Sequence, residues 1–246
     1  MDAVTVALEL AVQDPAGVRI AREVGAARVE LTQALALGGL TPSPATLELA
    51  LDAAGDDGPE IHVLIRPRAG GFQYDADEIA VSVRDVERAV SAGAAGVVVG
   101  ALDGSGALDM DAVARLRDAA GGASVTLHRA IDVTADPIAS LERAIELGLR
   151  RVLTSGGASA AIDGVDTLRA MATAAAGRIE IMAGSGVNAA SALALADTGV
   201  DALHFSAKRT IVGDSGVRMG SAADGVGGYE VTDRDAAFAV RAALKL

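Results

Sequence analysis

Five ionisable side chains stand inside, or at the end of, short apolar runs of the chain: Glu9, Glu30, Arg66, His128 and His204. A carboxylate or an imidazole in such a run has left water, so it needs either a partner or a chemical task. These residue types predict proton transfer, in which a glutamate is the general base and one of the two histidines is the general acid. Arg66 and Arg68 are expected to stabilise the negative charge that develops during the reaction.

Each of these residues also has a structural alternative. A single histidine in a strand is more often a hydrogen-bonded core residue than a ligand, and either glutamate could pair with Arg28 or Arg66. The third histidine, His62, precedes Arg66 by four residues, which is about 13 Å along a strand. We expect it in a lower layer of the core. Because several buried charges are costly unless they are paired or used, the group as a whole favours a functional site.

Two glycine-rich turns and a basic loop predict an anion site. Gly184-Ser185-Gly186 follows one apolar run and leads into a predicted helix with Asn188 as its N-cap, and Ser155-Gly156-Gly157 follows the run before it. Glycine lets the backbone approach a ligand, and a helix N-terminus presents free N–H groups to an anion. Tight turns without a ligand are the alternative. The residues expected to bind a phosphate or carboxylate are Arg68, Ser155, Gly156, Gly157, Gly184, Ser185, Gly186 and Ser206.

Apolar runs alternate with helical patterns along the whole chain. Eight such units predict an α/β fold, a (β/α)8 TIM barrel, as a single domain over residues 1–246. A doubly wound sheet is the alternative, although eight strands at such even spacing are unusual for it. The predicted strands are Val4–Leu10, Ala27–Thr32, Glu60–Arg66, Ala95–Gly100, Ala123–Arg129, Arg151–Ser155, Arg178–Ala183 and Asp201–Ser206.

Local signals place helices between these strands. Asp14-Pro15, Ser43-Pro44 and Asp136-Pro137 each combine an N-cap with a proline at the first helical position. Asp75 and Glu78 predict a capping box at the start of a helix over residues 75–93. Glycines that end a helix before an even-numbered strand stand at positions 25, 93, 148 and 199.

A barrel also determines where the polar strand residues point. Its outer face packs against helices and must be apolar, so polar side chains should point inward. Barrel active sites lie at the C-terminal strand ends, and phosphate sites lie in the loops after strands 7 and 8. Residues 68–74 and 207–231 form loops that could cover this end. The expected inward residues are Glu9, Glu30, Thr32, His62, Arg66, Thr126, His128, Glu180, His204 and Ser206.

Composition excludes several classes of protein. The net charge is −12, whereas nucleic acids and anionic membranes require clustered lysine or arginine. Cysteine is absent, which excludes disulfides, thiolate metal sites and cysteine nucleophiles. The N-terminus lacks the basic region of a signal peptide, and no apolar run approaches the roughly 18–20 residues of a membrane span. We expect a cytoplasmic protein whose partner is a small anionic ligand or a metal ion and which, like many soluble enzymes, forms a homodimer.

Several motifs, in order along about residues 4–209, resemble the CutC family of copper homeostasis proteins. The resemblance implies a (β/α)8 barrel and copper binding, with cysteines near the first two strands as ligands. Those positions hold Ala11 and Thr32 in this chain. The motifs are Leu8-Glu9-Leu10, Arg28-Val29-Glu30-Leu31, Gly38-Gly39-Leu40-Thr41-Pro42-Ser43, His62-Val63-Leu64-Ile65-Arg66-Pro67-Arg68, Thr126-Leu127-His128-Arg129-Ala130, Leu153-Thr154-Ser155-Gly156-Gly157-Ala158 and Gly184-Ser185-Gly186-Val187-Asn188.

Three classes of function remain open. In the first, copper homeostasis, copper(I) would lack the thiolates that it prefers, and copper(II) could be held by His128 and His204 with Glu9 or Glu30. The second is a barrel enzyme, an isomerase, epimerase or lyase, that acts on a small anionic or phosphorylated metabolite. The third, a binding or scaffold barrel without chemistry, is disfavoured by the number of inward ionisable groups. The occupant of the barrel mouth, metal or anion, would separate the first two classes.

Overall fold

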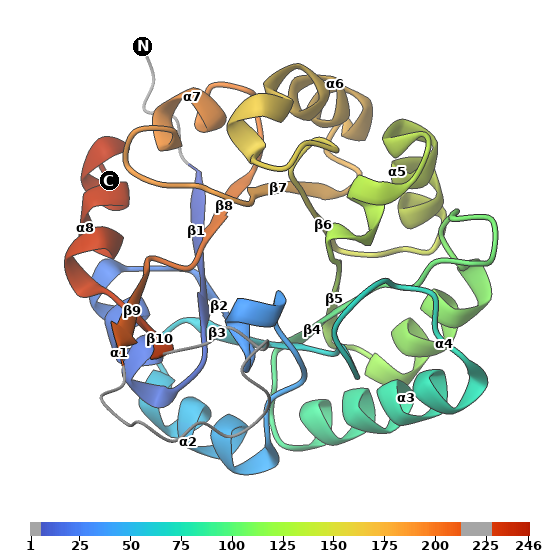
Figure 1. Ribbon diagram of the computed structural model, residues 1–246, viewed down its shortest axis with the longest axis horizontal. Helices are drawn as coiled ribbons and strands as arrows, with labels where there is room; N and C mark the ends of the chain where they lie inside the picture. Colours follow the sequence, from blue (N-terminus) through green and yellow to red (C-terminus); the bar gives the residue numbers. More distant parts are fainter. Residues whose placement is uncertain (1–5, 213–227) are drawn as a thin grey trace.

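The computed structural model describes residues 6–212 and 228–246. Within these ranges eight parallel strands close into a barrel, in which each strand pairs with the next and β8 returns to β1 (Figure 1). The predicted (β/α)8 barrel is confirmed, and the doubly wound alternative, which is an open sheet, is wrong. The strands are β1 (Ala7–Val12), β2 (Arg28–Leu31), β3 (Glu60–Leu64), β4 (Gly96–Val99), β5 (Ser124–Leu127), β6 (Arg151–Thr154), β7 (Glu180–Gly184) and β8 (Ala202–Phe205).

Helices cover the outside of the barrel (Figure 1). The predicted N-caps Asp14, Ser43 and Asp136 each accept a hydrogen bond from the first turn, and Asp75 and Glu78 form the predicted capping box. No helix in the described ranges is long and apolar enough to span a membrane. The helices are α1 (Pro15–Val24), α2 (Pro44–Ala54), α3 (Ala76–Ser91), α4 (Met110–Ala120), α5 (Pro137–Glu146), α6 (Val165–Ala175), α7 (Ala192–Ala196) and α8 (Arg234–Ala243), with the 310 helices η1 (Leu35–Leu37), η2 (Arg129–Val133) and η3 (Ala161–Gly164).

The helix after β7 starts later than the sequence indicates. Because α7 begins at Ala192, the prediction of Asn188 as its N-cap is wrong. Asn188 accepts a hydrogen bond from the Ala190 N–H and donates one to the Gly186 carbonyl. The segment after Gly184 is therefore held by turn hydrogen bonds, and a ligand there would meet a turn and not the end of a helix.

The strand register places charged side chains in layers inside the barrel. Glu9 on β1 lies level with Arg28 on β2 and with His204 on β8, and Glu30 follows Arg28 by one inward position. The outward strand side chains form the apolar core with the helices, so the interior is the only space left for these charges. His62 lies below the mouth, where Gly96 makes room for it, since a Cβ at Gly96 would lie 2.6 Å from the imidazole.

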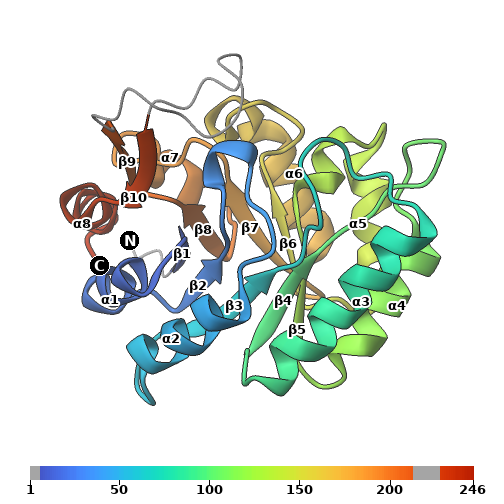
Figure 2. The same cartoon turned by 60° about the horizontal axis from the view of Figure 1, so that its bottom comes forward.

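Loops gather over the C-terminal end of the barrel (Figure 2). In the loop after β2, Gln33 and Leu40 pair across a turn that contains η1. After β8, the strand β9 (Lys208–Val212) pairs with β10 (Gly228–Thr232) in antiparallel fashion. The ends of the predicted loop 207–231 thus form a two-stranded hairpin, and its residues 213–227 lie outside the described ranges.

Candidate active site at the barrel mouth

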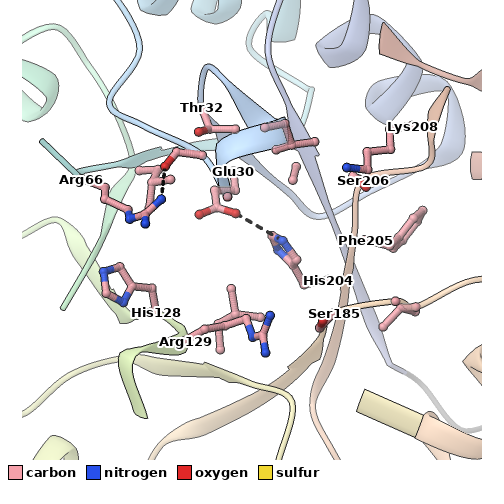
Figure 3. A pocket seen from close by; sticks show the side chains of 18 of the residues that line it. Glu30, Thr32, Arg66, His128, Arg129, Ser185, His204, Phe205, Ser206 and Lys208 are labelled. Carbon is pink, nitrogen blue, oxygen red and sulfur yellow. Dashed lines mark hydrogen bonds and ion pairs between the residues drawn. The ribbon is translucent and has the colours of Figure 1, made fainter. Parts of the chain in front are cut away.

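A pocket of about 440 Å³ opens at the C-terminal end of the barrel, where barrel enzymes carry their active sites (Figure 3). Its size suits a small metabolite. Seven of the predicted site residues line it: Glu30, Arg66, His128, Ser185, Gly186, His204 and Ser206. The walls also contain residues that sequence reasoning did not assign to the site, among them Leu35, Gly38, Gly39, Phe72, Arg129, Val187 and Lys208.

A chain of hydrogen bonds and ion pairs joins the charged groups beneath this pocket. Arg28 donates through Nε to Glu9 Oε2 over 3.0 Å, and Glu9 Oε1 lies 2.9 Å from His204 Nδ1. The other ring nitrogen, His204 Nε2, lies 3.2 Å from Glu30 Oε2. Glu9 is fully buried and does not line the pocket, whereas Glu30 does. Glu9 is therefore a positioning residue behind His204, and Glu30 is the carboxylate that a ligand can reach.

The same contacts set the protonation states of these groups. Burial raises the pKa of Glu30 to about 7; the charge of His204 opposes this shift and the charge of Glu9 adds to it. Burial also acts to raise the pKa of Glu9, but the hydrogen bond and charge of His204, with the charge of Arg28, lower it to about 2. Burial acts to lower the pKa of His204, yet the two glutamates outweigh it and the pKa is raised. Glu30 is therefore poised between acid and base near neutral pH, as a proton-transfer catalyst requires.

His128 lies at the end of β5, as predicted, but its protonation differs from that of His204. Its Nδ1 accepts a hydrogen bond from the Ala130 N–H over 3.1 Å. Burial, and then the charge of Arg66, lower the pKa of His128 to about 4, so the ring is neutral at pH 7. Gly100 is required beside it, because a Cβ there would lie 2.5 Å from Nδ1. Of the two histidines predicted as general acid, His204 carries the proton and His128 does not.

Arg66 is largely engaged by the backbone of two loops. Its Nη1 donates to the Leu37 and Gly39 carbonyls, each over 2.9 Å, and its Nη2 donates to the Gly70 carbonyl over 2.7 Å. The buried guanidinium thereby holds the loops after β2 and β3 together at the pocket rim. Both terminal nitrogens of Arg66 therefore serve to hold the loops. Nε is the nitrogen of this guanidinium that remains to bind a ligand.

Arg68 is not part of the pocket, so its assignment to the anion site is not supported. Its guanidinium forms an ion pair with Glu78 and lies 5.0 Å from the ring centroid of Tyr74. It also donates to the carbonyls of Gly71 and Gln73. Arg68 is thus bound to the carboxylate in the first turn of α3 and not to the barrel mouth, and a pairing between residues ten positions apart was not visible in the sequence.

The predicted anion site after β6 already holds an internal anion. The Asp132 carboxylate from η2 accepts hydrogen bonds from the Ser155 N–H and Oγ–H, from the Thr154 hydroxyl and from the Gly157 N–H. Arg129 Nε donates to it over 2.8 Å. The turn has the anion-binding geometry that its glycines predict, but Ser155, Gly156 and Gly157 do not line the pocket. An external ligand at this turn would compete with Asp132 for the same donors, and the anion site predicted there stays a prediction.

Asp132→Asn is expected to destabilise the fold by about 2–4 kcal/mol, because an amide would turn one N–H group toward these donors and lose charge-assisted bonds. Urea unfolding at pH 7 measures the change. Asp166→Asn, at a fully exposed aspartate paired with Arg169, is the matched control and should leave the unfolding free energy nearly unchanged. Equal effects of the two substitutions would contradict the assignment.

Three positive or polar side chains remain at the pocket wall: Ser185 after β7, Lys208 after β8 and Arg129 after β5. Ser185 has a φ of +89°, and its hydroxyl donates to the Ser159 carbonyl, so the turn presents Gly186 and Val187 to the pocket. Lys208 and Arg129 also line the pocket. Lys208 is the first residue of β9 and is separated from β8 by Ala207, whose φ is +41°, so strand alternation did not indicate it. These groups surround the position where the loops after strands 7 and 8 of a barrel bind phosphate.

Comparisons with known proteins agree on one family. The model of the CutC family matches residues 6–209. A CutC family protein of Xanthomonas campestris pv. campestris (strain 8004) is 45% identical over 227 residues, 92% of this chain and 93% of that protein. One from Histophilus somni (strain 2336) is 41% identical over 95% of this chain and 97% of its own length. The crystal structure of a CutC protein of Streptococcus agalactiae, which is provisionally described as a copper homeostasis protein, matches this chain with a TM-score of 0.78 and 30% sequence identity. The match covers 82% of this chain and 99% of that one.

Proposed function

The chain belongs to the CutC family, and from that premise we propose that it is an acid–base enzyme acting on a small anionic metabolite at the barrel mouth. One observation carries the proposal: Glu30, with a pKa of about 7, faces a pocket of about 440 Å³ while its partner His204 is held from behind by Glu9. An orienting carboxylate behind an imidazole that contacts the working group is a recurring arrangement in proton-transfer sites.

In this proposal the proton is transferred between the ligand and the Glu30 carboxylate. With its pKa near ambient pH, the carboxylate form takes a proton from the ligand and the acid form returns it. His204 stays protonated between the two glutamates, so it fixes the orientation of Glu30 and provides a positive charge that favours the carboxylate form. Isomerisation, epimerisation and lyase chemistry all need such a step.

The anionic part of the ligand would lie beside Lys208 and Arg129. Lys208 is about half exposed and reaches the pocket while pairing with Glu230 over 2.6 Å. Arg129 is oriented by Asp132 and borders the same space. The chain as a whole has a net charge of −12, whereas Lys208 and Arg129 bring positive charge to the pocket. This local positive charge would favour an anionic ligand.

Incubation with a panel of small phosphorylated and carboxylated metabolites in D2O, followed by NMR, tests the proposal. We expect conversion or deuterium uptake for at least one compound with the wild-type protein and its loss in Glu30→Gln. Conversion by Glu30→Gln at the wild-type rate would contradict the role of Glu30. A panel in which no compound changes would contradict the enzyme assignment itself.

Copper, the metal that the family name suggests, does not fit this site. Copper(I) prefers sulfur ligands, yet the chain has no cysteine, and Ala11 and Thr32 line the pocket where the resemblance implies cysteines. In the described ranges, Glu9, Glu30 and His204 form a group that could hold a cation. However, both nitrogens of His204 already contact the glutamates. His128 lies outside the group, so the copper(II) site with both histidines is not supported.

Titration of the purified protein with copper(I) and with copper(II) by calorimetry should therefore show no binding tighter than micromolar. The donor set offers no thiolate, and the imidazole would have to break its contacts with Glu9 or Glu30 to bind a metal. A 1:1 complex tighter than micromolar that weakens in Glu30→Gln would contradict this expectation and favour copper handling at the same pocket.

A further inference from the structure

Arg66 and His128 line the pocket, and each has one buried N–H group without a hydrogen-bond acceptor among the described residues. They are Nε of Arg66 and Nε2 of His128, and both atoms are shielded from solvent. A buried donor without an acceptor costs free energy comparable to a lost hydrogen bond, and native proteins keep few of them. Two such donors in the walls of one pocket indicate that an acceptor is supplied from outside the chain.

The direction of each donor is fixed by its other contacts. Nδ1 of His128 accepts the Ala130 N–H, so the ring proton of the neutral imidazole must lie on Nε2. Both Nη groups of Arg66 are bound to loop carbonyls, which prevents the guanidinium from turning its Nε–H elsewhere. The donors are therefore preorganised before a ligand arrives, as electrostatic catalysis requires.

The donors share one neighbour and face one base. The ring centroid of Phe72 lies 4.8 Å from that of His128, and its ring lies 5.5 Å from Arg66 Cζ. Figure 3 places Arg66 and His128 along one side of the pocket and His204 on the other, with the Glu30 carboxylate between them. A ligand that touches Glu30 therefore has the two donors within the same small space.

We propose that His128 and Arg66 bind the carbonyl oxygen of the substrate while Glu30 removes a proton from the adjacent carbon, so that the substrate is a small anionic aldehyde or ketone with a hydrogen on that carbon. This inference rests on the proposed function and narrows it to one class of reaction. The ring of Phe72 lies beside both side chains, and because both N–H groups are shielded from solvent we expect this ring to move when the carbonyl oxygen enters.

Electrons and protons balance within this step without a further reactant. The C–H bond breaks and its proton goes to the Glu30 carboxylate. The electron pair of that bond forms the C=C bond of an enolate, and the carbonyl π pair moves onto oxygen, where the two N–H groups hold it. Return of a proton from Glu30 to the same carbon restores the carbonyl compound, so the step is visible as exchange of that hydrogen with solvent. A neutral imidazole can polarise a carbonyl in this way.

Proton exchange in D2O, followed by NMR, tests the inference with matched probes. Dihydroxyacetone phosphate and glycerol 3-phosphate differ only in the oxidation of one carbon, and pyruvate provides a carboxylated ketone. We expect deuterium uptake into at least one of the two ketones and none into glycerol 3-phosphate. Uptake by neither ketone, or equal uptake by glycerol 3-phosphate, would overturn the inference.

Variants separate the donor pair from the base. His128→Leu should slow the exchange by roughly 100-fold to 1000-fold, the usual effect of losing one oxyanion donor. His128→Gln keeps an N–H group and should recover much of that loss. The pH midpoint of exchange should stay near 7 in both variants, because Glu30 still sets it. His62→Gln, a matched change in the lower layer, should alter the rate by less than about threefold.

The possible failures are distinguishable. Exchange that is lost in Glu30→Gln but unchanged in His128→Leu would overturn the donor pair and leave the proposed function intact. Exchange that persists in Glu30→Gln would overturn both. If His128→Leu fails to fold, His128→Gln with an altered pH midpoint contradicts the inference on its own.

Discussion

Glu30→Gln is expected to lower turnover by about 10²–10⁴-fold and, at the same time, to stabilise the protein at pH 8. The amide cannot exchange a proton with a ligand, which accounts for the lost activity. The gain in stability follows from linkage. The pKa of Glu30 is raised in the folded protein from its ordinary value of 4.5 to about 7. Its stabilising contribution is therefore full below pH 4.5 and is lost as the pH rises through 7, a loss of about 3 kcal/mol.

Urea unfolding at pH 4.5 and at pH 8 measures this effect. The Gln side chain has no charge to bury, so we expect the difference in unfolding free energy between the two pH values to be smaller in the variant than in the wild type by about 3 kcal/mol. Glu48→Gln, at an exposed glutamate on α2, is the control and should leave the difference unchanged. A Glu30→Gln variant that is inactive but follows the wild-type pH dependence would show that Glu30 is ionised at neutral pH, contrary to our account.

Glu9→Gln is expected to destabilise the fold by about 3–5 kcal/mol at pH 7, the usual cost of removing one partner of a buried ion pair. The glutamate is fully buried between Arg28 and His204, and its loss leaves the charge of Arg28 uncompensated apart from the more distant Glu180, 3.9 Å away. The pKa of Glu9 is lowered to about 2, so its contribution is present above pH 4.5 and is lost as the pH falls toward 2. The deficit of the variant should shrink accordingly in acid.

Thermal and urea unfolding of Glu9→Gln, Arg28→Met and the double variant test the pairing. The double variant should be more stable than the sum of the two single losses predicts, because neither charge is then left alone. Strictly additive losses would contradict a direct pairing inside the barrel. Destabilisation by Glu9→Gln that persists unchanged at pH 3 would contradict the assigned ionisation.

The barrel and its inward charges could be predicted from the chain because both follow from local periodicity. Apolar runs separated by capped helices indicate a parallel sheet, and eight such units favour its closure into a barrel. Alternation along the predicted strands then points Glu9, Glu30, His128 and His204 inward. The same periodicity does not tell which of two inward glutamates reaches the mouth. That distinction depends on the stagger between strands, which places Glu30 one layer above Glu9.

The partners of the loop residues assigned to the anion site could not be predicted, because loop contacts are not periodic. The turn at Ser155-Gly156-Gly157 has the expected geometry, but the 310 helix after β5 fills it with Asp132. Arg68 is engaged by Glu78 at the start of α3. Both cases are contacts between segments whose relative placement is fixed by the folded barrel and not by residue spacing. Lys208 is a similar case, because Ala207, with a φ of +41°, ends the alternation of β8 before Lys208 begins β9.

The most direct test of the central claim is the pKa of Glu30 in the free protein. The ¹³C chemical shift of its side-chain carboxyl can be followed by NMR between pH 4 and pH 9, with Glu30→Gln to assign the signal. Our account predicts a midpoint of about 7, raised by burial within the His204 and Glu9 network. A midpoint below 5 would mean that Glu30 is an ordinary ionised carboxylate at neutral pH and would contradict its role as the acid–base group of this pocket.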